Sequence, residues 1–462
     1  TTGNDATGDG TSGNPYLTVQ AGINAATAGD TVYITAGTYN VATQITVPVG
    51  INLMGAGNTS ILVLTYVSSS SSSGCIQLSS APTEGTNGNQ SISHLYIDGD
   101  LTGTNAIVVY CRSNVNVHDC TIIDFDQSGI TFRGNNLTGE AVTKATGNQV
   151  YNCSIINSST RGAVSDGLIR LYSQTNMDIH DNILDQRGKA EGSNGNILDA
   201  VGGYNSNIRY YRNKSYKPYT EGASQWNFHI ESWNGQGGWN VWGNEFHGGG
   251  CHIDVGGNTN VKGSYAYSWW IHGNLFTQDE LQPYNVNGYY TMGVDLERAV
   301  SDAIIERNIF NRLSFGVYIT TDVNGGTTNA RIRYNLFREI GSTNNVFCSA
   351  ILISSIDSGD GISGVYIDNN TMTAGTAYNV GAGLITGIWS NTVDEIYFRN
   401  NITSGFYRGP VWISTGNGQV DSLYYQGNLS NNTSNTFYYS SGETITKLTS
   451  SGNVTGNPLL KS

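Results

Sequence analysis

The sequence is poor in proline, in basic residues and in long apolar runs, and each shortage excludes a class of protein. Only 7 of its 462 residues are Pro against 59 Gly, which indicates many tight turns and not a disordered proline-rich tract. With 22 Lys and Arg against 35 Asp and Glu, the net charge is −13, which argues against nucleic-acid binding and, less strongly, against strongly anionic polysaccharides. No run is long and apolar enough to cross a bilayer, so we expect no membrane association.

Cysteine is also scarce and shows no spacing typical of a metal site. None of the 6 Cys residues forms a C-x-x-C motif. Cys120 and Cys153 follow the same position of a repeated phrase, so we expect them to lie close together. They form either a disulfide or a pair of buried small residues.

That repeated phrase runs from about residue 119 to residue 428. It consists of an apolar or aromatic residue, a polar spacer, an anchor that is usually Asn, and two residues that are mostly apolar. The anchor falls at residues 119, 152, 182, 213, 244, 274, 308, 335, 370, 401 and 428, at intervals of 27 to 35 residues. Such a period predicts stacked structural units that bury a continuous core.

The apolar residues between the anchors alternate with polar ones, as in 251–255, 293–297 and 316–320. This is the period of a β-strand, and Gly, Asn, Ser and Thr between the runs are typical of turns. The pattern predicts an all-β chain that forms one parallel β-helix of roughly twelve coils. The anchoring Asn side chains are expected to form a ladder along it. We expect a single domain over 1–462, with an N-terminal capping helix at about 15–30, coils at about 30–440 and a C-terminal cap or tail at 441–462.

The first forty residues resemble a known family. The phrases Tyr-Leu-Thr-Val-Gln-Ala-Gly-Ile-Asn-Ala-Ala at 16–26 and Gly-Asp-Thr-Val-Tyr-Ile-Thr-Ala-Gly-Thr-Tyr at 29–39 are similar to the N-terminal cap of pectate-lyase-like right-handed β-helix proteins. The resemblance implies a right-handed fold and a secreted, extracellular carbohydrate context. It names no reaction, because that superfamily includes lyases, hydrolases, epimerases and phage tailspikes.

Alternation along the strand before each anchor predicts a row of outward-facing charged side chains. Residues two apart share a face of a strand, so the apolar residues identify the inward face. The outward position of five consecutive coils is then occupied by Arg170, Asp199, Glu231, Asp254 and Asp295. The same argument places His229, His252 and Glu297 on the outer face. Like charges on adjacent strands repel one another, so the row is a candidate functional site.

Glycoside hydrolysis is the reaction that this row favours, since it requires one protonated carboxyl and one carboxylate. Glu231 and Asp254 are the predicted central pair, with Asp199 and Asp295 as flanking catalytic candidates. Arg170, His229, His252 and Glu297 are predicted to bind substrate. Carboxyls on neighbouring coils match the retaining separation and those on alternate coils approach the inverting one, so the stereochemistry stays open. This chemistry needs no cofactor.

Two other chemistries fit the same row. In a polysaccharide lyase, Asp199, Glu231 and Asp254 would hold Ca²⁺ against a uronate, and Arg170 or Arg298 would act as the base. A transition-metal site could instead use His229, Glu231, His252 and Asp254.

Outward aromatic side chains favour a polysaccharide or oligosaccharide partner, because they stack on sugar rings. The predicted binding aromatics are Trp233, Tyr318, Trp389 and Trp412. A non-catalytic alternative is a glycan-binding fibre, adhesin or tailspike body. We expect a monomer, or a trimer in the tailspike case.

Overall fold

The computed structural model describes residues 3–68, 70, 72–135, 143–158, 167–188, 195–218, 228–233, 237–257, 265–279, 290–321, 325–343, 347–355, 361–375, 381–388, 392–415, 419–431, 437–439 and 445–456. They belong to two compact units, Thr1–Pro218 and Tyr219–Ser462, called here the N-terminal and C-terminal units.

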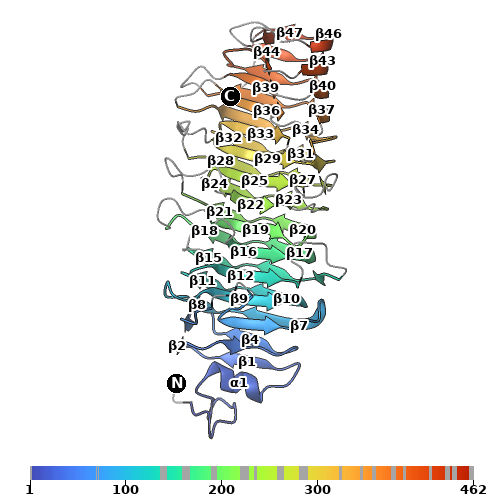
Figure 1. The fold of residues 1–462 in the computed structure, drawn as a ribbon. Helices are drawn as coiled ribbons and strands as arrows, with labels where there is room; N and C mark the ends of the chain where they lie inside the picture. The colour runs from blue at the N-terminus through green and yellow to red at the C-terminus, as the bar shows by residue number, and fades with distance from the viewer. Residues whose placement is uncertain are drawn as a thin grey trace. The chain divides into compact units, whose positions relative to one another are not determined.

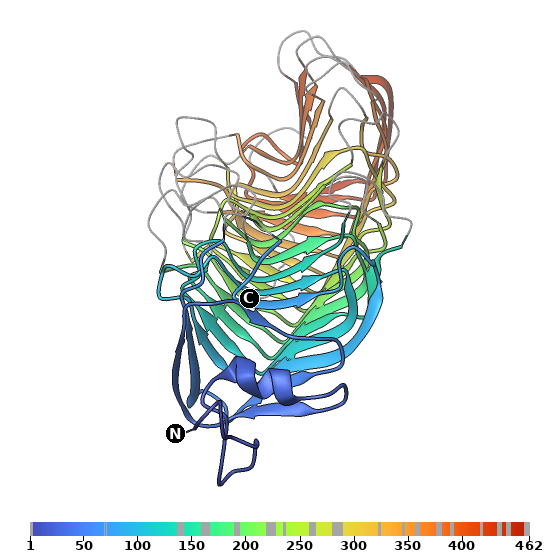
Figure 2. The same ribbon diagram turned by 60° about the horizontal axis from the view of Figure 1, so that its bottom comes forward.

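The N-terminal unit begins with the helix that the sequence predicted at 15–30. Helix α1 spans Val19–Ala25, and the Thr18 side chain caps it by accepting a hydrogen bond from the Ala21 N–H. Val19 and Ile23 are its buried residues. Figure 2 shows α1 at the end of the N-terminal unit, beside the first strands.

Every coil contributes up to three strands, and each strand pairs in parallel with the equivalent strand of the next coil (Figure 1). The sheets are named the first-, second- and third-strand sheets after the order of their strands in a coil. In the N-terminal unit, the first-strand sheet contains β1 (Thr31–Ile34), β4 (Asn52–Gly55), β7 (Thr86–Ser93), β10 (Arg112–His118), β14 (Gln149–Tyr151), β17 (Gln174–His180) and β20 (Ser206–Tyr211), with β13 (Ala145–Thr146) beside β17. The second-strand sheet contains β2 (Gly37–Val41), β5 (Ser60–Leu64), β8 (Tyr96–Asp98), β11 (Thr121–Ile123), β15 (Ser154–Ile156), β18 (Ile183–Asp185) and β21 (Lys214–Tyr216). The third-strand sheet contains β3 (Ile45–Thr46), β6 (Ile76–Ser79), β9 (Asn105–Tyr110), β12 (Ser128–Arg133), β16 (Gly167–Tyr172) and β19 (Asn196–Gly202).

The C-terminal unit repeats this arrangement. Its first-strand sheet contains β23 (Asn240–Trp242), β27 (Trp270–His272), β31 (Ile304–Glu306), β34 (Arg331–Arg333), β37 (Ile362–Asp368), β40 (Thr392–Arg399), β43 (Gln419–Gln426) and β46 (Ile445–Ser451). Its second-strand sheet contains β24 (Glu245–His247), β28 (Leu275–Thr277), β32 (Ile309–Asn311), β35 (Leu336–Ile340), β38 (Thr371–Ala374), β41 (Ile402–Ser404), β44 (Leu429–Asn431) and β47 (Val454–Thr455). Its third-strand sheet contains β22 (Phe228–Ser232), β25 (Cys251–Gly256), β29 (Met292–Arg298), β33 (Phe315–Thr320), β36 (Ser349–Ser355), β39 (Ala382–Ile388), β42 (Val411–Thr415) and β45 (Phe437–Tyr439). A two-stranded sheet pairs β26 (Ala266–Tyr267) with β30 (Val300–Ser301).

Long parallel sheets built from successive coils confirm the predicted all-β, parallel β-helix class. Strands β46 and β47 lie within the segment predicted as a C-terminal cap or tail, and they pair in parallel with β43 and β44. No helix among the described residues is long and apolar enough to span a membrane.

The Asn anchors form hydrogen-bonded ladders inside both units. In the N-terminal unit, the Asn182 side-chain amide donates to Asn213 Oδ1 at 2.9 Å and to the Val150 carbonyl at 3.0 Å. In the C-terminal unit the same contact links consecutive members of the series Asn244, Asn274, Asn308, Asn335, Asn370, Asn401, Asn428 and Asn453. Each amide with both contacts therefore satisfies buried polar groups of the preceding and the following coil.

The predicted anchors at 119 and 152 are wrong by one residue. The Cys153 N–H donates to Asn182 Oδ1, so Cys153 and not Asn152 occupies the ladder position of its coil. Cys120 precedes it, and the Cys153 thiol donates to the Val117 carbonyl as the Asn182 amide does to Val150. Both cysteines are buried free thiols, which decides between the two alternatives left open by the sequence.

Candidate functional site

The predicted acidic row is present in the third-strand sheet of the C-terminal unit. Glu231 of β22 lies opposite Asp254 of β25, and Asp254 lies opposite Asp295 of β29. Neighbouring strands are about 4.8 Å apart, so these carboxyls are adjacent along the sheet. Their residues are only 7%, 1% and 7% exposed, so the row is largely removed from solvent, whereas the sequence predicted a solvent-facing one.

Beyond Asp295 the row becomes apolar. Asp295 lies opposite Tyr318, and the following partners are Leu352, Ile385 and Trp412. These apolar residues belong to a cluster that also contains Phe228, Cys251, Met292, Phe315 and Ala382, against which Tyr290, Tyr318 and Phe347 pack. The carboxyls therefore lie next to a hydrophobic environment.

Trp412 does not have the exposed face expected of a sugar platform. It is 6% exposed within this cluster, and the Arg408 guanidinium lies 3.7 Å from the centre of its ring. The prediction failed because the outward side of this sheet is covered at Trp412, so an outward position is not an exposed one. Trp389 lies outside the described residues.

Asp254 is the most deeply buried member of the row, and its pKa is raised well above the ordinary value. Burial is the largest cause, followed by the negative charges of Glu297, Asp295 and Glu231. A hydrogen bond of 2.6 Å from Trp233 Nε1 to Asp254 Oδ2 acts in the opposite direction. The balance favours a protonated Asp254 carboxyl.

The pKa of Asp295 is also raised well above the ordinary value. Burial and then the charge of Glu297 raise its pKa, while Arg298 lowers it. Arg298 donates to Glu297 Oε1, and its guanidinium lies 4.9 Å from the centre of the Trp233 ring. Arg298 thus contacts both Glu297 and Trp233, the residue that donates a hydrogen bond to Asp254.

Two carboxylate oxygens of the row have no hydrogen-bond partner among the described residues. They are Asp254 Oδ1 and Asp295 Oδ1, and both are buried. An unsatisfied buried oxygen costs free energy, so each is a position where a substrate hydroxyl or a cation would gain a contact. Carboxylate oxygens also suit Ca²⁺. Of the predicted calcium ligands, Glu231 and Asp254 lie on adjacent strands, whereas Asp199 is bound to Arg170 in the N-terminal unit.

The predicted outward placement of His229 and His252 is wrong. Both side chains are fully buried, and the His252 ring stacks on Phe246 and Phe276 of the second-strand sheet. The apolar residues before the histidines explain the error: Phe228 and Cys251 belong to the cluster that contains Trp412, and not to the inward face that alternation assigns to them. Alternation is therefore interrupted at the start of these strands, and the histidines turn inward.

The burial of His252 also removes it from proton transfer near neutral pH. Its pKa is lowered to about 3 by burial, so the ring is neutral. The hydrogen bonds from His229 and His252 Nε2 run to the Gly248 carbonyl, at 3.1 and 2.9 Å. Because both rings face away from Glu231 and Asp254, the predicted transition-metal set is not assembled.

The N-terminal unit places Arg170 and Asp199 on adjacent strands, as predicted, but they neutralise each other. Arg170 Nε lies 3.2 Å from Asp199 Oδ2, and both side chains are buried. Asp199 Oδ1 also accepts a hydrogen bond from the Val201 N–H. Tyr172 accepts a hydrogen bond from Arg170, and burial followed by the Asp199 charge raises its pKa to about 12.

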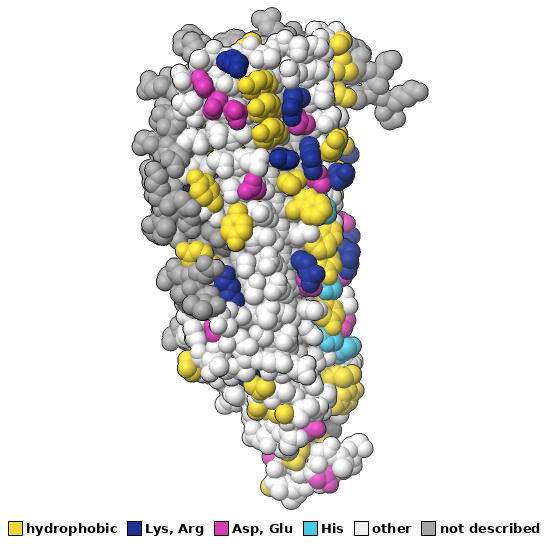
Figure 3. Space-filling model, turned by 90° about the vertical axis from the view of Figure 1, so that its right-hand side faces the viewer, with side chains coloured by type: hydrophobic (Ala, Val, Ile, Leu, Met, Phe, Trp, Pro, Cys, Tyr) yellow, Lys and Arg dark blue, Asp and Glu magenta, His cyan; other side chains and the backbone are white. Residues whose placement is uncertain are grey.

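Other carboxylates in the first-strand sheets are paired with arginine from the next coil. Arg209 binds Asp178 in the N-terminal unit, and in the C-terminal unit Arg333 binds Glu306 at 2.7 Å and Arg399 binds Asp368 at 2.8 Å. Figure 3 shows basic and acidic side chains lying next to each other on this face. Ion pairing between coils is thus common here, and the row at Asp254 and Asp295 departs from it.

One cluster was not predicted as a site. His94, His118 and Asp119 of the N-terminal unit place a ligand atom each within 4.8 Å of one another. The available signal in the sequence was the His-Asp pair at 118–119, which recurs at 180–181.

Comparison with known proteins supports the fold. No protein-family profile and no curated protein matches the chain. Among solved structures, the catalytic unit of a thermostable GH87 alpha-1,3-glucanase from Streptomyces thermodiastaticus is similar, with a TM-score of 0.52 and 14% identity over 97% of this chain. The alignment spans 66% of the glucanase unit, just under two thirds of its length.

Two further structures are more distant. Gene product 12 of bacteriophage phi29 has a TM-score of 0.49 and 11% identity, over 91% of this chain and 68% of that one. A mannuronan C-5 epimerase A-module from Azotobacter vinelandii has a TM-score of 0.37 and 13% identity, over 95% of this chain and 94% of that one. At these identities the likeness concerns the fold alone. The chain has a parallel β-helix fold.

Proposed function

We propose that the protein is a glycoside hydrolase that cleaves a polysaccharide at the acidic row of the C-terminal unit. The observation that carries the proposal is Asp254, a buried carboxyl with a raised pKa between two further carboxyls. Glycoside hydrolysis requires such a protonated acid beside an ionised carboxylate. The similar fold of a glucanase catalytic unit agrees with this activity.

Asp254 is assigned the role of general acid, which donates its proton to the leaving glycosidic oxygen. Burial, and then the charges of Glu297 and Asp295, disfavour its ionisation, so the carboxyl keeps its proton to a higher pH than an ordinary aspartate does. As the proton leaves, the indole N–H of Trp233 stabilises the new carboxylate through its bond to Oδ2.

Glu231 is assigned the role of the second carboxylate, directly opposite Asp254 on β22. At about 4.8 Å between strands, this pair corresponds to the retaining separation, in which Glu231 acts as a nucleophile. Glu231 and Asp295, two strand spacings apart, correspond to the inverting separation, so the anomeric configuration of the product identifies the pair in use.

A neutral glycan is the preferred substrate class. The net charge of −13 disfavours binding of a uronate polymer. Trp233 lies beside Asp254 and Tyr318 follows Asp295 in the row, so aromatic rings flank the acids where a sugar would bind. The chain is proposed to act outside the cell, as its family resemblance implies.

A calcium-dependent lyase is the second candidate, favoured by the partnerless oxygens of Asp254 and Asp295. In that case these residues would bind Ca²⁺ and Arg298, next to Glu297, would be the nearby base. The ion would neutralise the uronate carboxylate, and Arg298 would accept the proton from the sugar ring.

The test is a product assay on a panel of neutral and uronic-acid polysaccharides, with and without a chelator. Reducing ends and unsaturated sugar ends are measured in the same samples. Chelator-resistant reducing ends without unsaturation, lost in Asp254→Asn and Glu231→Gln, support the hydrolase. Chelator-sensitive unsaturated ends support the lyase, and absence of both products on every substrate contradicts an enzymatic function.

A further inference from the structure

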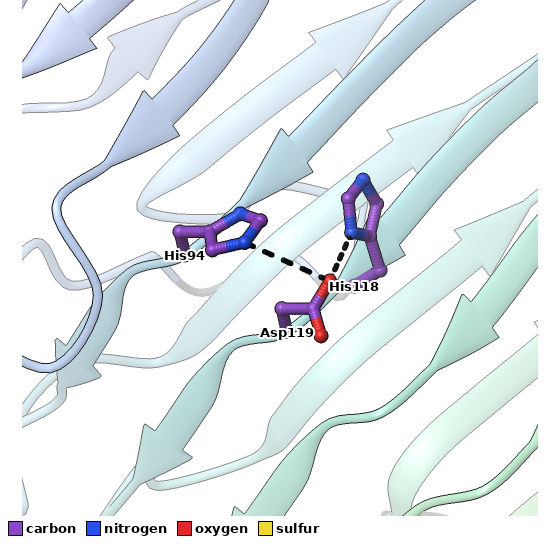
Figure 4. A group of neighbouring side chains, drawn as sticks. All are labelled: His94, His118 and Asp119. Carbon is purple, nitrogen blue, oxygen red and sulfur yellow. Dashed lines mark hydrogen bonds and ion pairs between the residues drawn. The ribbon is translucent and has the colours of Figure 1, made fainter.

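A second site is present in the N-terminal unit, independent of the acidic row. His94, His118 and Asp119 lie at the corner that follows the first strand of consecutive coils, after β7 and at the end of β10 (Figure 4). Ser93 pairs with His118, so His94 and Asp119 occupy the same position of neighbouring coils. Their side chains converge from two coils on one point of the surface.

The backbone fixes this arrangement. His94 and Asp119 both have left-handed conformations, with φ of 56° and 53°. The His94 N–H donates to the His118 carbonyl, and the Asp119 N–H donates to the Tyr151 carbonyl. The His118 ring is also held by stacking on Tyr151, with ring centres 4.7 Å apart. Backbone hydrogen bonds and ring stacking therefore fix the positions from which the three side chains extend.

The distances between the ligand atoms are close to those of a metal centre. Asp119 Oδ2 is hydrogen-bonded to His118 Nδ1 at 2.7 Å and lies 3.9 Å from His94 Nε2. Donors bound to one Zn²⁺ ion at about 2.1 Å are about 3.0 to 3.4 Å apart. Side-chain movements of about half an ångström would bring both distances into this range.

The His94 ring has unused bonding capacity. Its Nδ1 is buried without a hydrogen-bond partner among the described residues, and its Nε2 lies beyond hydrogen-bond distance of Asp119. In the part of the chain that the structure describes, the basic side chains closest to the Asp119 carboxylate are the two histidines, and no arginine or lysine forms an ion pair with it. The corner thus has a carboxylate and an imidazole nitrogen available to a cation.

The same unit contains a natural comparison. His180 and Asp181 repeat the His-Asp pair at 2.7 Å, two coils further along. There Arg212 neutralises the carboxylate, and Asn152 occupies the place that corresponds to His94. A His-Asp pair alone is therefore a recurring corner structure. The corner at Asp119 differs in two ways: it has His94 on the preceding coil, and Asn152 takes the place that corresponds to Arg212 on the following coil.

We propose that His94, His118 and Asp119 bind a divalent transition-metal ion, with Zn²⁺ as the best-fitting class. Two imidazoles and one carboxylate are ligands typical of such ions, and three protein ligands leave a position for water or a ligand group. Because the ligands come from consecutive coils, the ion would also join these coils.

Calorimetric titration of the full, tag-free chain with ZnCl₂ after chelator treatment tests the proposal. The matched variants are His94→Asn, because Asn152 already has the required conformation, with φ of 53°, and His180→Asn as the control at the other corner. We expect one equivalent of Zn²⁺ to bind the wild type, His94→Asn to weaken this binding at least about tenfold, and His180→Asn to leave it unchanged.

Thermal unfolding provides a second readout that does not depend on catalysis. Zn²⁺ should raise the unfolding temperature of the wild type and of His180→Asn, and not that of His94→Asn. Equal Zn²⁺ affinity in the wild type and His94→Asn, or equal weakening in both variants, would overturn the proposal.

Discussion

The third-strand sheets of the two units carry charged residues at outward positions, but the neighbours of these residues differ between the units. In the N-terminal unit Asp199 has Arg170 on the adjacent strand, and the two form a buried ion pair. In the C-terminal unit Asp254 has carboxylates on both adjacent strands, and its pKa is raised. The first arrangement stabilises ionised groups, whereas the second retains protons, as acid catalysis requires.

The largest expected effect is on activity, which should depend on Asp254 and not on Asp199. Asp254→Asn removes the proposed proton donor and should lower kcat by about 10² to 10⁴-fold. Asp199→Asn, the matched change in the other unit, should retain kcat within about tenfold. Initial rates of reducing-end formation measure both. Equal losses would show that the two positions are not functionally distinct.

The next effect is on stability, and here the change at Asp199 is expected to be more damaging than the change at Asp254. Asp199→Ala leaves the buried Arg170 guanidinium without its carboxylate, so the free energy of unfolding should fall by about 3 to 5 kcal/mol. Denaturant unfolding followed by circular dichroism measures it. A change below about 1 kcal/mol would mean that the ion pair contributes little.

At neutral pH, Asp254→Asn should instead stabilise the C-terminal unit by about 1 to 3 kcal/mol, because a neutral amide replaces a carboxyl that resists ionisation. A raised folded-state pKa gives stability that is complete below the unfolded value of 3.8 and is lost as pH rises through the folded pKa. The gain in the variant should therefore disappear in acid.

The variant must be compared with the wild type at each pH, because His252 acts in the opposite direction. Its lowered pKa of about 3 gives stability that is present above the unfolded value of 6.5 and is lost as pH falls through about 3. The His252 contribution cancels in the difference. A difference that is constant with pH would contradict the raised pKa of Asp254.

The smallest effect is expected from Trp233→Phe. This change removes the hydrogen bond that lowers the pKa of Asp254 while it keeps an aromatic ring. The basic limb of the kcat/KM profile, where the acid loses its proton, should move to higher pH by up to about one unit. An unchanged profile would mean that Asp254 does not set this limb.

Much of the fold and part of the site could be predicted from the sequence. The period of the Asn anchors reports on the stacking of coils, so the parallel β-helix was predicted correctly. The adjacency of Glu231, Asp254 and Asp295 on neighbouring strands was also predicted, but their burial was not. The histidines before Ile230 and Ile253 were misplaced because Phe228 and Cys251 join the cluster that contains Trp412, so the first residues of these strands depart from the expected alternation.

Other features depend on contacts that sequence spacing does not specify. A thiol can take the ladder position of an Asn amide, so the anchor was misread at Cys153. Outward direction was mistaken for exposure at Trp412, because the cover over a sheet comes from residues distant in the sequence. The ion pair of Asp199 with Arg170 depends on side-chain geometry, and so does the hydrogen bond that Asp254 accepts from Trp233.

Infrared difference spectroscopy of the chelator-treated chain near pH 7 tests the contrast between the units most directly. The wild type and Asp199→Asn should both show the carbonyl stretch of a protonated carboxyl, and Asp254→Asn should lose or shift it. A wild-type spectrum without a protonated carboxyl would contradict the proposed acid and leave a cation-binding role for the row.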